Sequence, residues 1–266
     1  MKPIFLIMKF FLTIILLLAC TTSQKSDTNN TKTTDLPEGT AKTTVTTNPA
    51  VADKTAESNQ PKDSLSATAR SMEKQGMVNV KSVDPTIEVS LMYSRPDNFT
   101  GQVLYDDLRE GYLHPKAAKA LAIAQRRLHE LRPDLSLIIF DATRPISIQR
   151  KMWNVVKDTP KYFYVSNPDR GGGMHNYGMA VDISICRVGG DTIPMGATVD
   201  FMGDLSHIDK EDQLVKSHRM TKEAQANRQL LREVMAAGGF MPLRTEWWHF
   251  NLCTRKEAKA HYKLIK

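Results

Sequence analysis

The chain has 266 residues, 41% of them hydrophobic, and a formal net charge of +7 at pH 7. This is enough for one domain of roughly 100 to 200 residues plus additional material. The positive excess forms no basic cluster, which disfavours nucleic-acid binding, and three cysteines are too few for a disulfide scaffold.

Residues 1–20 have the features of a secretory signal, with two lysines before an apolar run from Phe10 to Leu18. The end of this segment, Leu17-Leu18-Ala19-Cys20, resembles a bacterial lipobox, in which the cysteine is lipidated and becomes the first residue of the mature protein. We therefore expect an extracytoplasmic lipoprotein that contacts a membrane only through lipidated Cys20 and faces the periplasm or the cell surface. The alternative, an uncleaved anchor helix, also places the rest of the chain outside the cytoplasm.

Residues 21–71 are rich in Thr, Ser, Asn, Lys and Asp and contain no aromatic residue. Such a segment cannot bury enough apolar area to offset the entropy cost of ordering. We interpret it as a disordered tether, and a coil of about 50 residues spans roughly 40 Å root-mean-square. The catalytic domain is then expected over residues 72–266.

Hydrophobic spacing and end signals predict four regular elements in this domain. Leu121 and Leu128 fall near helical spacing before Pro133, and Thr221 is a suitable N-cap for a helix that ends at two glycines. The elements are a helix over 115–131, a strand over 135–141, a helix opened by Arg144-Pro145 that continues through Val156, and a helix over 221–237.

Two further segments, 180–186 and 247–253, alternate between two faces as strands do. Asp182 lies on one face of the first segment, and His249 lies on one face of the second. If the two strands pair, both side chains can face one pocket. The fold class expected is α+β, with a small antiparallel sheet that carries the site and is flanked by helices.

His175, Asp182 and His249 are the candidate metal ligands. Two histidines and a carboxylate are a recurrent ligand set for catalytic zinc that leaves the fourth position for water. Gly178 allows the chain to turn between His175 and the strand of Asp182. A helical HExxH motif is absent, so the site must be assembled from separate elements. A single buried His or Asp is usually structural, and the zinc interpretation depends on all three residues together with Glu246.

Glu246 is the candidate catalytic acid/base. It lies three residues before His249, so in a regular strand its side chain would point away from the metal. We therefore expect a turn or bulge at the strand entrance. Given that irregularity, Glu246 can take a proton from the attacking water and pass it to the leaving amine.

The motifs His175-x-x-Gly178-x-Ala180-x-Asp182 and Glu246-x-x-His249 resemble the SxHxxGxAxD and ExxH signature of a group of zinc peptidases. Within that group the chain is most similar to the D-alanyl-D-alanine dipeptidases of peptidase family M15, which include the vancomycin-resistance dipeptidases. The segments that carry this likeness are Asp97-Asn98-Phe99-Thr100-Gly101, Asp141-x-x-Arg144-Pro145 and Glu246-Trp247-Trp248-His249-Phe250.

The resemblance implies one Zn²⁺ held by His175, Asp182 and His249, Glu246 as acid/base, and Arg144 as the group that stabilises the transition state. By itself, Arg144 would be read as a surface residue at the start of a helix. There are two departures. The family serine two positions before the first ligand is Gly173 here, and residues 200–205 follow the family's substrate loop only in part.

The function expected is zinc-dependent hydrolysis of the small dipeptide D-alanyl-D-alanine in cell-wall peptide turnover. A D,D-carboxypeptidase or endopeptidase acting on peptidoglycan stem peptides is the alternative enzyme. A lipoprotein that only binds wall peptides is the alternative outside enzymes, and it would be indicated by a missing ligand or a missing Glu246. None of these residues is missing.

Cys186 and Cys253 each follow a candidate ligand by four residues. If the two strands bring them together, they form a disulfide behind the metal; otherwise they are two small buried core residues.

Overall fold

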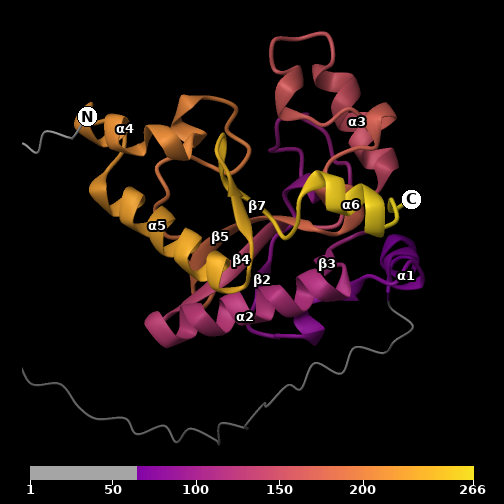
Figure 1. The fold of residues 1–266 in the computed structure, drawn as a ribbon, viewed down its shortest axis with the longest axis horizontal. Coiled ribbons are helices and arrows are strands. Elements are labelled where there is room, and N and C mark those ends of the chain that lie inside the picture. The colour runs from indigo at the N-terminus through magenta and orange to yellow at the C-terminus, as the bar shows by residue number, and fades with distance from the viewer. Residues whose placement is uncertain (1–64) are drawn as a thin grey trace, which may run out of the picture. The chain divides into compact units, whose positions relative to one another are not determined.

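The computed structural model describes residues 65–266 (Figure 1). The expected signal segment 1–20 with Cys20, and most of the expected tether, lie outside these residues. Helix α1 (Ala67–Lys74) begins inside the stretch 21–71 that was expected to be tether. The Ser66 hydroxyl caps it by accepting from Ala69 N at 3.0 Å, and Ala69 and Met72 are buried. A helix that packs against the core is therefore already present several residues before 72.

The centre of the domain is a five-stranded sheet with the strand order β2-β4-β5-β7-β6. Its strands are β2 (Glu88–Val89), β4 (Leu135–Asp141), β5 (Ala180–Arg187), β7 (Glu246–Asn251) and β6 (Met241–Leu243). The four strands from β4 to β6 are antiparallel, which confirms the predicted α+β class and antiparallel sheet. The edge strand β2 runs parallel to β4. With only two residues, β2 was too short to be recognised from its pattern. A separate pair is formed by β1 (Val78–Asn79) and β3 (Tyr112–Leu113).

The helices predicted from spacing are present. α2 spans Pro115–Leu131, α3 spans Ile146–Val156 and α5 spans Lys222–Ala237. The Thr221 hydroxyl caps α5 by accepting from Ala224 N at 3.0 Å. Two short helices, α4 (Glu211–Lys216) and α6 (Arg255–His261), were not predicted. None of the helices within residues 65–266 has the length and apolar character that crossing a bilayer requires.

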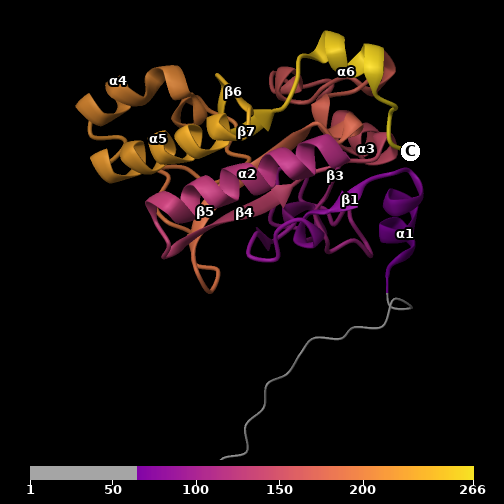
Figure 2. The same cartoon turned by 60° about the horizontal axis from the view of Figure 1, so that its bottom comes forward.

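Helices α2 and α5 lie side by side against the sheet (Figure 2). α2 contacts β4 through the apolar face that contains Leu121, Ala124 and Leu128, all of them fully buried. Of the eight residues of β5, only Arg187 is exposed. Burial on both faces explains why the polar side chain of Asp182 lies in the interior, where it needs a partner.

The disulfide hypothesis for Cys186 and Cys253 is wrong, since both are free and buried. β5 and β7 are antiparallel, with Asp182 opposite His249. Cys186 and Cys253, each four residues beyond this pair, therefore lie in opposite directions from it. Cys186 instead lies beside Ser136 O of β4, at 3.5 Å.

Candidate active site

His175 is carried by a short 3₁₀ turn, Met174–Tyr177, that leads directly into β5. The turn ends at Gly178, whose φ of 67° is a left-handed conformation that favours glycine. A Cβ at this position would lie 2.8 Å from both His114 N and Met77 Sδ. The predicted role of Gly178 as the turn between the first ligand and the strand of the second is therefore confirmed, for steric as well as conformational reasons.

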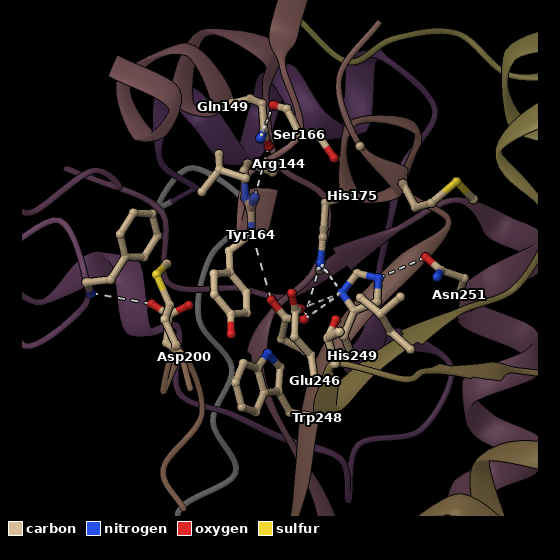
Figure 3. A pocket seen from close by; sticks show the side chains of 18 of the residues that line it. Arg144, Gln149, Tyr164, Ser166, His175, Asp200, Glu246, Trp248, His249 and Asn251 are labelled. Carbon is tan, nitrogen blue, oxygen red and sulfur yellow. Dashed lines mark hydrogen bonds and ion pairs between the residues drawn. The ribbon is translucent and has the colours of Figure 1, made fainter. Parts of the chain in front are cut away.

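The three candidate ligands converge in a small volume (Figure 3). His175 Nε2 lies 3.1 Å from His249 Nδ1 and 3.3 Å from Asp182 Oδ1, and His249 Nδ1 lies 3.0 Å from the same oxygen. Ligands at about 2.0 to 2.2 Å in a tetrahedral arrangement are separated by about 3.3 Å. The three atoms are therefore spaced as one tetrahedral metal ion requires.

The opposite nitrogen of each histidine is engaged by an oxygen. His175 Nδ1 donates to Ala142 O at 2.7 Å, and His249 Nε2 contacts Asn251 Oδ1 at 2.9 Å. Because a carbonyl only accepts, these contacts direct the proton to the outer nitrogen and leave the inner lone pairs facing one another.

Asp182 brings a negative charge to the same point. Burial alone would raise its pKa, but His175 and His249 hold that pKa well below its usual value, so the carboxylate is ionised. Two imidazole nitrogens and a carboxylate oxygen about 3 Å apart need a proton or a metal cation between them. The donor set therefore fits a metal ion.

Glu246 lies on the same side as the metal ligands. The register between β6 and β7 is irregular, with Pro242 opposite Phe250 but Leu243 opposite Glu246. The extra β7 residues in this bulge bring Glu246 Oε2 to 3.9 Å from His249 Nδ1. The strand irregularity expected from the spacing of Glu246 and His249 is therefore present. Burial raises the pKa of Glu246 to about 7, which suits a group that exchanges protons near neutral pH.

Arg144 is buried beside the ligands, and the surface position that its place at a helix start would suggest is not observed. Its Nε and Nη2 both donate to Asp141 Oδ2, at 2.9 and 2.5 Å, and Nη1 donates to Gln149 Oε1 at 2.9 Å. Asp141 also accepts from Tyr105 Oη at 2.7 Å. Burial by itself lowers the pKa of Arg144, but Asp141 and other nearby groups hold that pKa well above its usual value. Two of the five N–H groups of this guanidinium remain available, with Nη2 3.8 Å from Asp182 Oδ2.

Asp200 is a pocket residue that we did not single out from the sequence. Its carboxylate accepts from Tyr93 Oη at 3.1 Å and from Phe99 N at 3.4 Å, and burial raises its pKa to about 7. Its φ of 69° is unusual for a residue other than glycine. The sequence signals were indirect, since Asp200 begins the 200–205 segment and Phe99 belongs to the quoted motif 97–101.

These groups line one cavity of about 290 Å³. Asp200 and Glu246 approach the cavity from different directions, and the aromatic side chains of Tyr164 and Trp248 lie between them (Figure 3). Arg255, at the start of α6, also reaches the cavity, and its Nη2 donates to Gly172 O at 2.7 Å. The cavity is therefore small, has both apolar and polar walls, and carries charges of both signs.

Comparison with known proteins gives the same family as the sequence motifs. The family model described as D-ala-D-ala dipeptidase, of peptidase family M15, matches residues 73–266. The D-alanyl-D-alanine dipeptidase of Escherichia coli (strain K12) is 33% identical over 180 residues, which cover 66% of this chain and 84% of that protein. The proteins of the same name from Enterococcus faecalis and Streptomyces coelicolor are 28% and 31% identical, over 60% of this chain and 83% of each relative.

Proposed function

Because the chain belongs to the D-Ala-D-Ala dipeptidase family of metallopeptidases, M15, we propose that it hydrolyses D-alanyl-D-alanine to two molecules of D-alanine with one zinc ion bound. The observation that carries this proposal is the convergence of His175 Nε2, Asp182 Oδ1 and His249 Nδ1 within 3.0 to 3.3 Å, with Glu246 beside them.

His175, Asp182 and His249 would hold the zinc, since imidazole and carboxylate ligands with one position left open are typical of catalytic zinc. When bound, the ion supplies Lewis-acid polarisation of the peptide carbonyl and lowers the pKa of water. Ala142 O and the Asn251 side chain keep both imidazoles in the tautomer and orientation that the ion needs.

Glu246 is the acid/base of the reaction. Its carboxylate takes the proton of the attacking water and then donates that proton to the nitrogen of the leaving D-alanine. A pKa of about 7 allows both transfers near neutral pH, since neither the ionised nor the protonated form is strongly disfavoured.

Arg144 stabilises the negative charge that develops on the carbonyl oxygen as water adds. Asp141 and Gln149 keep its guanidinium in place and leave two N–H groups unused by these contacts. A donor that is already oriented pays no reorganisation cost during the reaction, and the loss of one such donor costs about 2.7 to 4 kcal/mol of barrier.

The two ends of a free dipeptide have charged partners in the pocket. Among the pocket carboxylates, Asp182 is a ligand and Glu246 exchanges protons, so Asp200 is left to bind the substrate ammonium. Among the pocket guanidiniums, Arg144 is held by Asp141, so Arg255 is left to bind the C-terminal carboxylate.

Asp200 favours the dipeptide over a stem peptide. In a stem peptide, the residue before the scissile bond carries an amide in place of an ammonium. The Asp200 carboxylate, whose charge is already disfavoured by burial, would then lack the ion pair that the ammonium of a free dipeptide provides. This charge requirement separates the dipeptidase from the D,D-carboxypeptidase or endopeptidase alternative.

We place this activity outside the cytoplasm, in turnover of cell-wall peptides. The support is the lipobox-like Leu17-Leu18-Ala19-Cys20 at the end of a signal-like segment. Lipidation of Cys20 would anchor the enzyme to the membrane. Mass spectrometry of the membrane-extracted protein, compared with the Cys20→Ala variant, tests this lipidation. Loss of the lipid mass in the variant is expected.

The function is tested by measuring D-alanine release by the zinc-loaded protein from D-Ala-D-Ala and from a peptidoglycan pentapeptide. Glu246→Ala is the control and should lose at least about 10²-fold in kcat. We expect D-alanine release from the dipeptide and none from the pentapeptide. Release from the pentapeptide would assign the enzyme to wall trimming, and Glu246-independent release from either substrate would contradict the assigned mechanism.

A further inference from the structure

Position 173 is where this chain departs from the family signature, with glycine in place of the serine two residues before the first ligand. The structure shows what fills the space of the absent side chain. A Cβ built on Gly173 would lie 2.9 Å from Ser166 Oγ and 3.2 Å from Ser166 Cβ. A side chain at 173 would therefore crowd the hydroxymethyl group of Ser166, which would have to move from its present position.

Ser166 lines the same cavity as His175 and Arg144 (Figure 3). Its position is set by Gln149, whose Nε2 donates to Ser166 O at 2.8 Å while its Oε1 accepts from Arg144 Nη1 at 2.9 Å. Within residues 65–266 the Ser166 hydroxyl makes no hydrogen bond to protein. A hydroxyl held at the wall of the cavity without a protein partner is available to a ligand.

The surroundings of this hydroxyl indicate which part of a ligand it meets. Gly173 follows Gly172, whose carbonyl accepts from Arg255 Nη2 at 2.7 Å. Ser166 therefore adjoins the loop that holds Arg255, whereas the carboxyl group of Asp200 approaches the cavity from another direction (Figure 3). A hydroxyl donor beside a guanidinium suits a carboxylate, because both donate hydrogen bonds.

We propose that Ser166 supplies, from a different segment of the chain, the hydroxyl that the signature carries at position 173, and that it donates a hydrogen bond to the C-terminal carboxylate of the substrate. This inference rests on the proposed function. It makes Ser166 a substrate-binding residue and accounts for the presence of glycine at 173.

The test is a double-mutant cycle of Ser166→Gly, Gly173→Ser and the combined exchange, with Ser166→Ala as a second variant that removes the hydroxyl without adding backbone freedom. Melting temperature and kcat/KM for D-Ala-D-Ala are measured for each zinc-loaded protein. We expect Ser166→Ala to lower kcat/KM about tenfold or more, mainly through KM. Gly173→Ser alone should lower both the melting temperature and kcat/KM because of the clash.

The combined variant, Ser166→Gly with Gly173→Ser, should regain the melting temperature that Gly173→Ser loses. It should also regain at least half of the lost kcat/KM on a logarithmic scale, because the clash is removed and a hydroxyl is restored. Recovery of melting temperature without recovery of kcat/KM would overturn the role of the hydroxyl. An unchanged KM in Ser166→Ala would overturn it as well. If the unaltered protein releases no D-alanine, the proposed function fails, whereas non-additive melting temperatures would still support the steric exchange.

Discussion

Asp182 lies directly opposite His249 in the antiparallel pairing of β5 and β7, with Oδ1 3.0 Å from Nδ1. The ladder of the sheet thus sets the distance between the second and third candidate ligands. Because backbone hydrogen bonds hold this pair on two buried strands, we expect the site to be largely preorganised before metal binds.

Removal of the metal should lower stability without unfolding the domain. A ligand present at about 100 times its Kd stabilises the folded state by about 2.7 kcal/mol, and the apolar core does not depend on the site. We expect a chelator to lower the melting temperature and added Zn²⁺ to restore it. Asp182→Asn should be insensitive to both treatments. An equal response to Zn²⁺ in Asp182→Asn would mean that the ion binds elsewhere.

Asn251→Ala should weaken zinc binding without touching a ligand. Asn251 Oδ1 is the partner of His249 Nε2 at 2.9 Å, and loss of such a partner typically costs 10- to 100-fold in metal affinity. Competition with a chromophoric chelator measures the affinity. The control is Asn227→Ala, which removes a hydrogen bond to Pro194 O that involves none of the candidate ligands. This variant should leave the zinc affinity unchanged.

Asp200→Asn should stabilise the metal-free protein at high pH. The pKa of Asp200 is raised to about 7 by burial and by Asp182, so the folded state binds this proton more tightly than the unfolded state. The resulting stability is fully present below about pH 4 and is lost as pH rises through about 7.

The asparagine variant does not titrate. Its free energy of unfolding should therefore exceed that of the unaltered protein by up to about 4 kcal/mol at pH 8 and by little at pH 4. Urea unfolding at the two pH values in the presence of a chelator measures this difference. A difference that is the same at both pH values would show that Asp200 is not the titrating group.

Arg228 should position the loop that carries Asp200. Its fully buried guanidinium donates to Met195 O at 2.6 Å and to Leu205 O at 2.9 Å, on either side of Asp200. Arg228→Met leaves these two carbonyls without their donors, which costs about 1 to 3 kcal/mol each. We expect a higher KM for the dipeptide and faster amide hydrogen exchange in residues 195–205.

Arg232→Met is the matched control for this change. Arg232 Nη1 and Nη2 pair with the same Glu211, at 2.8 and 2.7 Å, and Arg228 Nη1 lies 3.5 Å from that carboxylate. Neither single variant therefore leaves Glu211 without a cation. The 195–205 loop should exchange as in the unaltered protein when Arg232 is replaced, and equal acceleration in both variants would contradict a specific role for Arg228.

Much of the framework could be predicted from the sequence by itself. The helices over 115–131 and 222–237 and the strands of Asp182 and His249 follow from local periodicity and end signals, which act within a few residues. The candidate ligand set followed from residue chemistry and motif spacing. Even the irregularity beside Glu246 could be expected, because a regular strand would have turned this side chain away.

Only the tertiary structure decided which distant residues complete the pocket. The antiparallel direction of β5 and β7 separates Cys186 from Cys253, and the backbone conformation of Asp200 brings a carboxylate into the pocket beside Tyr93. Ser166 fills the space left by Gly173 from seven positions away in the chain. Sequence pattern records which way a side chain faces along its own element, whereas steric exclusion and charge pairing between elements depend on distances that exist only after the chain has folded.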